Sequence, residues 1–187
     1  MDKIKLIFPA VEHKGAAESY KKEFFDCNEA VINGSALLDQ MAYDEWLENT
    51  KRNSNPKTAR ADWVAASTFF AIRESDSRII GMIDIRHNLN NEFLAQYGGH
   101  IGYSVRPSER RKGYAAKMLQ QALDYARGLG LSSVMLGCYS DNLASKKTIE
   151  TCDGRLAEVK PYLDGRMMNV YWIDLTIIYS SSFSSTI

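Results

Sequence analysis

The sequence predicts a single α+β domain, and three observations indicate this class. The chain has 187 residues, which fits one domain with a full hydrophobic core. Apolar residues recur at helical spacing in some segments, whereas other segments are rich in β-branched and aromatic residues and are paired through short polar turns. No repeat or linker divides the chain, so we expect one domain over residues 1–178 and a flexible Ser-rich tail over residues 179–187.

The first third of the chain predicts one strand and two helices. A weak alternation over residues 4–8 predicts a short strand. Apolar residues at helical spacing predict a helix over residues 12–29, and Ser35 is a candidate N-cap for a second helix over residues 36–49. The polar segment over residues 51–60 is predicted to be a loop.

The remainder of the chain predicts strands with two helices between them. The strands over residues 63–73 and 78–87 form a predicted hairpin around the turn Glu74-Ser75-Asp76-Ser77. The later elements are a polar loop over 88–96, a strand over 99–105, an amphipathic helix over 113–127, a buried strand over 134–139, a helix capped by Asp141 or Asn142 that ends near Thr151, and strands over 155–161 and 169–178.

The composition argues against several classes of function. Lysine and arginine together number 23, and aspartate and glutamate together also number 23. The chain therefore has no net positive charge with which to bind nucleic acid. No apolar run approaches ~18–20 residues and no signal peptide is evident, so we expect a cytoplasmic protein without a membrane partner. Cys27, Cys138 and Cys152 lack metal-ligand spacing, which predicts free thiols and no metal site.

The most informative segment joins the predicted strand ending at Val105 to the predicted helix starting at Gly113. Its basic turn, Arg110-Arg111-Lys112-Gly113, would present unpaired backbone N–H groups and the positive end of a helix dipole, which together bind phosphate. Gly113 permits close approach because it has no Cβ, and three cations suit a pyrophosphate. The alternative is that these residues form an ordinary solvated turn with Gly113 as its flexible point. The sequence contains neither a P-loop nor a dinucleotide-binding fingerprint.

Further motifs surround this turn. The preceding strand ends in Val105-Arg106-Pro107, the turn continues as R-x-x-G-x-A through Tyr114 and Ala115, and Asn142, Ser145, Glu150 and Gly154 follow downstream. This order resembles the GCN5-related N-acetyltransferase (GNAT) superfamily over roughly residues 60–178. The resemblance implies a layered α/β/α fold with a mixed, mostly antiparallel central sheet whose central strands splay apart. The segments around Ile83 and His100 also resemble a bacterial group of predicted acetyltransferases.

The resemblance implies that acetyl-CoA is the cosubstrate and lies between the splayed strands. Its pyrophosphate would lie on the amides of Arg111, Lys112, Gly113, Tyr114 and Ala115, with Arg110 shaping the turn. Its pantetheine arm would pair with the backbone of Val105. Asn142 would contact that arm or a bound water and can also be a helix N-cap. Ser145 belongs to the same set, with a purely structural role as its alternative.

The implied reaction is direct transfer of the acetyl group, with the Tyr103 N–H polarising the thioester carbonyl. The sequence departs from the family pattern at two positions. Ile149 stands where an acidic tyrosine is frequent, and Gly99 stands where some members carry a glutamate base. Other groups, or a chain of water molecules, would therefore have to move the protons.

Three side chains are candidates for that proton transfer. His100 begins a strand and would need a β-bulge to face the same side as Tyr103. Asp84 shares a strand face with Arg86, and the two could line the acceptor pocket; Tyr139 ends the buried strand and could protonate the thiolate. Each of the three has a purely structural alternative. His100 could be a structural histidine at a strand edge, Asp84 could belong to a charged, solvent-facing strand edge, and Tyr139 could pack and hydrogen-bond locally.

The leading hypothesis is an N-acetyltransferase that acts on a primary amine of a small molecule or peptide. A non-catalytic acyl-CoA-binding regulatory module is the alternative, favoured by the two departures from the family pattern. An interaction domain with a degenerate cofactor site is disfavoured by the intact basic turn. Acceptor specificity is expected in residues 28–60 and 88–97, and a homodimer through the last strands is one option that the sequence leaves open.

Overall fold

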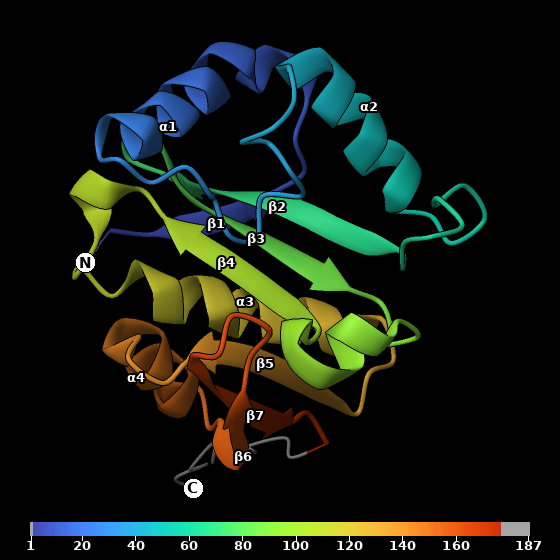
Figure 1. Ribbon diagram of the computed structural model, residues 1–187. Coiled ribbons are helices and arrows are strands. Elements are labelled where there is room, and N and C mark those ends of the chain that lie inside the picture. Colours follow the sequence, from blue (N-terminus) through green and yellow to red (C-terminus); the bar gives the residue numbers. More distant parts are fainter. Residues whose placement is uncertain (1, 177–187) are drawn as a thin grey trace, which may run out of the picture.

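The computed structural model describes residues 2–176, which form two antiparallel sheets with helices on both sides (Figure 1). The first sheet has the strand order β1-β2-β3-β4, and the second has the order β5-β7-β6. The strands are β1 (Ile4–Ile7), β2 (Ala66–Arg73), β3 (Ile79–Arg86), β4 (Ile101–Val105), β5 (Ser133–Tyr139), β6 (Arg155–Pro161) and β7 (Met167–Asp174). The predicted α+β class is therefore confirmed.

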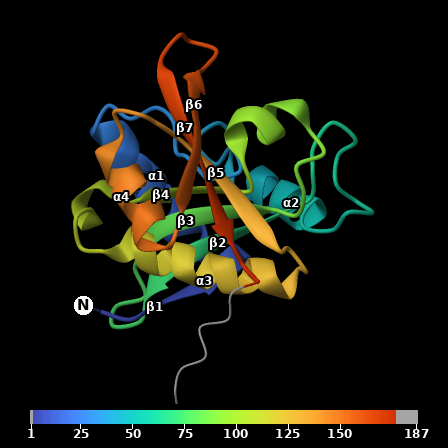
Figure 2. The same ribbon diagram turned by 90° about the horizontal axis from the view of Figure 1, so that it is seen from below.

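Within residues 2–176, four α-helices cover the sheets. They are α1 (Lys14–Asp26), α2 (Tyr43–Asn53), α3 (Tyr114–Gly128) and α4 (Leu143–Thr151), with short helical turns η1 (Val11–His13), η2 (Leu94–Gly98) and η3 (Pro107–Glu109) between them. Helices α1 and α2 lie on one face of the first sheet, and α3 lies on its other face, between the two sheets, with α4 packed against α3 (Figure 1). Figure 2 shows the turn between β6 and β7 projecting away from the other elements.

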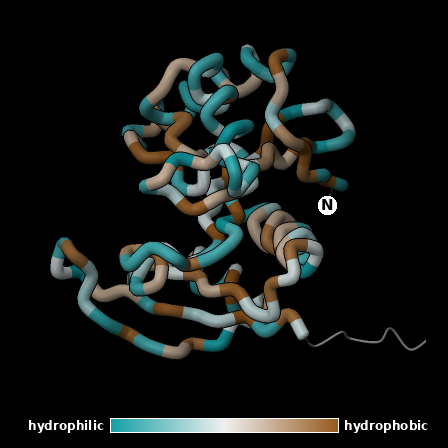
Figure 3. The backbone as a smooth tube through the Cα atoms, turned by 90° about the vertical axis from the view of Figure 1, so that its right-hand side faces the viewer, coloured by the Kyte–Doolittle hydropathy of each residue, from teal (hydrophilic) through white to brown (hydrophobic). Residues whose placement is uncertain are grey.

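Two clusters of buried side chains hold these layers together. One packs α1 and α2 on the first sheet and includes Tyr20, Trp46 and Phe70. The other surrounds α3 and draws on both sheets, with Met118 and Leu136 among its members. Hydrophobic residues accordingly occur in both the upper and the lower part of the view in Figure 3. Helix α3 thus joins the two sheets, because its buried face packs on both.

The predicted helix over residues 36–49 is wrong in its first half. Helix α2 begins only at Tyr43, and the preceding segment forms turns. Ala36 and Leu37 have φ angles of 50° and 69°, which a right-handed helix cannot contain. Ser35 is not an N-cap; its hydroxyl donates to the Asp39 carboxylate at 2.9 Å.

A tertiary contact explains this segment. A Cβ at Gly34, where φ is +68°, would lie 2.1 Å from the carbonyl oxygen of Gly102 on β4. The Ser35 carbonyl in turn accepts the Trp46 Nε1–H at 2.7 Å. The segment is shaped by its contact with the sheet, so local propensity does not decide its conformation.

Other predicted elements differ mainly at their ends. The first hairpin strand starts at Ala66, and the predicted polar loop over residues 88–96 runs into the helical turn η2. The last strand, β7, ends at Asp174. The predicted strand end at residues 177–178 and the predicted tail over residues 179–187 lie outside the described residues.

Candidate functional site

Two edge strands, β4 and β5, meet at one point and are otherwise separate. Gly99 and Leu136 form an isolated bridge between the two sheets, and the His100 N–H donates to the Met135 carbonyl at 2.7 Å. The described part of the chain has no further backbone pairing between β4 and β5. Beyond His100, β4 therefore has no strand beside this edge, which is the splayed arrangement that the family resemblance implied.

Two glycines allow the backbones to touch at this junction. A Cβ at Gly99, where φ is +64°, would lie 2.4 Å from the Met135 carbonyl oxygen. A Cβ at Gly137 would lie 2.1 Å from the Tyr97 carbonyl oxygen. No real Cβ approaches backbone atoms so closely, so larger residues would force β5 away from Gly99, at the start of β4, and from η2.

The free edge of β4 presents backbone groups toward the split. The Arg86 N–H donates to the His100 carbonyl at 2.8 Å, and the Arg106 N–H donates to the Ile80 carbonyl at 2.7 Å. Because hydrogen-bonding directions alternate along an antiparallel strand, the Tyr103 and Val105 backbones face away from β3. The Tyr103 N–H has no acceptor within residues 2–176.

The basic turn between β4 and α3 leaves a row of backbone donors free. Arg111 and Gly113 have φ angles of 61° and 75°, and α3 begins at Tyr114. The N–H groups of residues 111–116 find no acceptor in the part of the chain that the structure describes. Consecutive free N–H groups at a left-handed turn and a helix start form an anion-binding concavity.

The three cations of this turn have different surroundings. The Arg110 guanidinium forms a bidentate pair with Glu29, at 2.6 and 2.8 Å, and its Nε donates to the Val105 carbonyl at 3.1 Å. Lys112 donates to Glu109 at 2.9 Å. Arg111 is exposed and contacts no carboxylate among the described residues. Arg110 and Lys112 are therefore engaged within the protein, whereas Arg111 has no carboxylate partner among the described residues.

Two carboxylates that sequence reasoning missed anchor the segment before the turn. Glu109 is 3% exposed and accepts from Arg73 at 3.0 Å and Arg78 at 3.1 Å. Burial opposes ionisation, yet hydrogen bonds and nearby cations lower the pKa of Glu109. Glu23 on α1 accepts from Arg106 at 2.8 Å, and despite burial its hydrogen bonds lower its pKa to about 2. No local pattern signals these pairs, because their partners are distant in sequence.

The start of α4 is tied to β4 across the split. Asn142 is the N-cap of α4, and its side-chain oxygen accepts the Ser145 N–H at 3.0 Å. The Ser145 hydroxyl hydrogen-bonds with the Tyr103 hydroxyl at 2.9 Å. Burial raises the pKa of Tyr103 to about 12, so its phenol stays protonated at neutral pH. Tyr103, Asn142 and Ser145, all predicted site residues, thus lie together.

His100 is held at the junction of the strands. It is 6% exposed, and its Nδ1 accepts the Met135 N–H at 3.0 Å. Burial, followed by the charge of Arg86, lowers the pKa of His100 to about 4. The imidazole is therefore neutral at pH 7.

Asp84 and Tyr139 stand apart from Tyr103. Asp84 is buried and opposite Gly102, so its side chain points to the sheet face that Tyr103 does not occupy. Its carboxylate accepts from Thr68 at 2.8 Å, and burial raises the pKa of Asp84. The Tyr139 hydroxyl donates to Asp164 in the β6–β7 turn at 2.9 Å. Burial first, and then that hydrogen bond, raises the pKa of Tyr139. The structure therefore does not gather the four proposed catalytic residues around one point.

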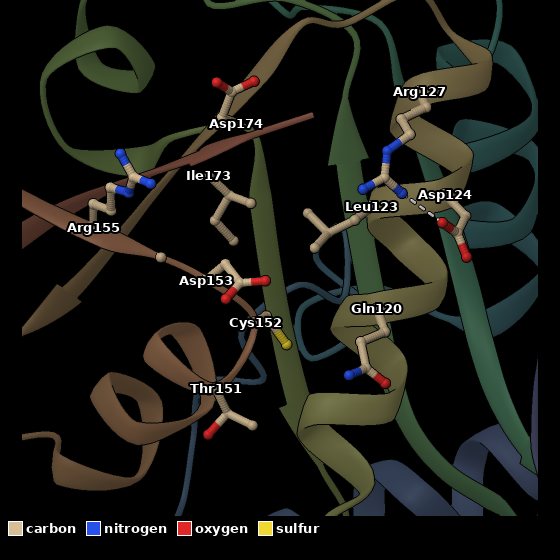
Figure 4. Close-up of a pocket in the computed structure, with 11 residues that line it drawn as sticks. Gln120, Leu123, Asp124, Arg127, Thr151, Cys152, Asp153, Arg155, Ile173 and Asp174 are labelled. Atoms are coloured by element: carbon tan, nitrogen blue, oxygen red, sulfur yellow. Dashed lines mark hydrogen bonds and ion pairs between the residues drawn. The ribbon is translucent and has the colours of Figure 1, made fainter. Parts of the chain in front are cut away.

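A pocket of about 590 Å³ lies elsewhere, between α3, the end of α4 and β7 (Figure 4). Its lining includes Gln120, Arg127, Cys152, Arg155 and Asp174. None of the predicted site residues lines it, and it is on the carboxyl-terminal half of α3, whereas the free N–H groups are at the opposite end. We therefore assign the candidate site to the β4–β5 split and the basic turn.

Cys138 and Cys152 are buried, and Cys27 is exposed. Burial raises the pKa values of Cys138 and Cys152, so both thiols are protonated at neutral pH. Residues 2–176 contain no cluster of three or more His, Cys, Asp or Glu side chains suited to a metal ion. Nor does any helix within that range have the length and apolar character needed to cross a bilayer.

Comparison with known proteins places this geometry in a family. Residues 37–153, more than half of the chain, match the model of the acetyltransferase (GNAT) family. Among curated proteins no match was found.

Solved structures share the fold at low sequence identity. RimJ from Mycobacterium smegmatis, in complex with CoA-disulfide, has a TM-score of 0.69 and 14% identity over 91% of this chain and 81% of its own. The microcin self-immunity acetyltransferase MccE, in complex with acetyl-CoA and AMP, has a TM-score of 0.68 and 17% identity, with 93% of each chain covered. YncA, a putative acetyltransferase from Salmonella typhimurium, was solved with its cofactor acetyl-CoA and has a TM-score of 0.64 and 13% identity over 92% and 94% of the two chains. The chain therefore belongs to the GNAT family of acetyltransferases, and its general chemistry is acyl transfer.

Proposed function

We propose that the protein is an acetyl-CoA-dependent N-acetyltransferase that acetylates a primary amine of a small molecule or peptide. The row of free N–H groups over residues 111–116 carries this proposal, because it lies beside the open edge of β4. A pyrophosphate would satisfy donors that nothing in the described chain satisfies.

The residues present fit acetyl-CoA, which supplies the acetyl group as a thioester. The amides of residues 111–115 and the Arg111 side chain would hold the pyrophosphate. The backbones of Tyr103 and Val105 would pair with the pantetheine arm. Three structural neighbours were solved with acetyl-CoA or a CoA derivative, which supports the same cosubstrate here.

The chain's own groups then have distinct tasks. The Tyr103 N–H is a fixed donor toward the split and needs no reorganisation when negative charge develops on an oxygen. The Tyr103 hydroxyl keeps its proton at neutral pH and hydrogen-bonds with the Ser145 hydroxyl on the α4 side. The Asp84 carboxylate accepts from Thr68, and the Tyr139 hydroxyl donates to Asp164, so we expect the acceptor amine to lose its proton to water.

Calorimetric titration with acetyl-CoA tests the donor site first. We expect a Kd of roughly 1–100 μM, about −8 to −5.5 kcal/mol. A screen of primary amines, followed by release of the CoA thiol, then tests catalysis. Absence of binding at millimolar acetyl-CoA would overturn the proposal.

A non-catalytic acyl-CoA-binding module remains the second candidate. The observation that favours it is the engagement of Asp84 with Thr68 and of Tyr139 with Asp164, which leaves neither side chain free as a proton carrier. This candidate predicts tight acetyl-CoA binding without turnover on any amine. Thiol release above the rate of uncatalysed hydrolysis would exclude it.

A further inference from the structure

Among the described residues, His100 is the one that hydrogen-bonds to both β3 and β5 at the junction. Its carbonyl accepts the Arg86 N–H of β3 at 2.8 Å, and its N–H donates to the Met135 carbonyl of β5 at 2.7 Å. Its Nδ1 also accepts the Met135 N–H at 3.0 Å. A single residue therefore satisfies both the donor and the acceptor of Met135, as a paired strand residue would.

This arrangement determines which ring nitrogen carries the hydrogen. Nδ1 can accept the Met135 N–H only when it is unprotonated, so the neutral imidazole carries its hydrogen on Nε2. Nε2–H can donate a hydrogen bond but cannot take up a proton. For Nε2 to become a base, the hydrogen would have to move to Nδ1, where it would face the Met135 N–H.

We propose that His100 is a positioning residue whose Nδ1 holds the Met135 amide and so fixes the point where β4 and β5 separate. Tyr103 follows three positions later on β4, so the direction of its N–H depends on that point. The consequence for catalysis rests on the proposed acetyl transfer, whereas the structural role does not. The proposal replaces the expectation that His100 takes the proton from the acceptor amine.

The surroundings of the ring agree with this role. Burial is the main factor that disfavours the charged imidazolium, and the positive charge of Arg86 on β3 is the second. An oxygen of the Asp84 carboxylate lies 3.4 Å from the Arg86 Nε. On the other side the ring meets the indole of Trp172 on β7, with 6.2 Å between ring centroids. A ring held neutral between these groups can accept the Met135 N–H throughout the neutral pH range.

Two amide substitutions separate positioning from proton transfer. In His100→Asn the side-chain oxygen stands the same number of bonds from Cα as Nδ1, whereas in His100→Gln it stands one bond farther. We expect His100→Asn to stay within about threefold of wild type in kcat/KM and acetyl-CoA affinity, with an unchanged acid limb of the pH–rate profile. We expect His100→Gln and His100→Ala to lose at least tenfold in kcat/KM. Equal losses in all three variants, with the acid limb removed, would overturn the proposal.

Two further measurements do not require turnover. Nitrogen NMR of the folded wild-type protein should show His100 as the Nε2–H tautomer, without titration, from pH 5 to 8. The melting temperature of His100→Asn should exceed that of His100→Ala and His100→Gln. An Nδ1–H tautomer, or a His100 titration within that range, would overturn the proposal even if no amine substrate is found. Failure of every amine with these results intact would count against the proposed function alone.

Discussion

The two ends of β4 use their backbone donors in opposite ways. At the start, His100 donates to Met135 and also accepts from it, so the junction is closed by the protein itself. Past the other end, the N–H groups of residues 111–116 have no acceptor among the described residues. Both regions depend on a glycine with positive φ, Gly99 and Gly113. The same backbone N–H groups thus stabilise the fold where their acceptor belongs to the protein, and they can bind a ligand where the described chain supplies no acceptor.

Filling the open end should have the strongest effect on acetyl-CoA affinity. Gly113→Glu places a side chain and a negative charge on the proposed phosphate site, so we expect acetyl-CoA affinity to fall at least 100-fold, about 2.7 kcal/mol. Calorimetry measures this loss. Gly130→Glu is the matched control, since Gly130 has φ +83° and no neighbouring atom within 4 Å of a built Cβ. Equal affinity in the two variants would show that the turn does not bind the cosubstrate.

A substitution at the closed end of β4, where it meets β5, should lower the stability of the protein. Gly99→Ala adds a Cβ at 2.4 Å from the Met135 carbonyl oxygen and at a positive φ, so we expect a loss of about 2–4 kcal/mol and a melting temperature lower by about 5–10 °C. Gly128→Ala, in the open space at the end of α3, is the control and should be neutral or stabilising. A Gly99→Ala protein as stable as wild type would refute the close contact of the two strands.

Acidification should weaken the ion pairs that hold the segment before the turn. The pKa of Glu23 falls from 4.5 to about 2 on folding, through hydrogen bonds from Ser108 and Arg106 that outweigh burial. Its contribution is therefore complete above pH 4.5 and is lost as the pH falls toward 2. We expect Glu23→Gln to be roughly 2 kcal/mol less stable at pH 6 and to lose less on acidification. Denaturant unfolding measures both, and parallel pH curves for the two proteins would contradict the assignment.

Within the basic turn, Arg111 and Lys112 should have different and smaller effects. Arg111→Ala should lower acetyl-CoA affinity about fivefold, about 1 kcal/mol, with little change in melting temperature, because Arg111 contacts no described carboxylate. Lys112→Ala is the companion variant and should act mainly on stability, since it removes a partner of the buried Glu109. The reverse result would contradict this prediction: a loss of stability in Arg111→Ala and a loss of acetyl-CoA affinity in Lys112→Ala would make Lys112 the ligand-binding residue and Arg111 the structural one.

Local sequence determined the elements that depend on near neighbours. The helical spacing of Met118, Leu119 and Ala122 predicts α3, and all three side chains are buried. The basic turn directly precedes that helix in the sequence and contains Arg111, Lys112 and Gly113. The turn and its unpaired backbone N–H groups could therefore be predicted from the order of the residues. Asn142 was one of two N-caps that the sequence predicted, and its partner, Ser145, is only three residues away.

Tertiary structure alone decided the features whose partners are far apart in sequence. Contact between Gly34 and Gly102 overrode the predicted start of the second helix. His100 and Met135 are 35 residues apart, so no pattern around His100 could show that its Nδ1 is engaged. Glu23 reaches Arg106 across 83 residues. Propensity and periodicity report on interactions within a few residues, whereas the hydrogen bonds that set these side chains' roles form only when distant segments pack together.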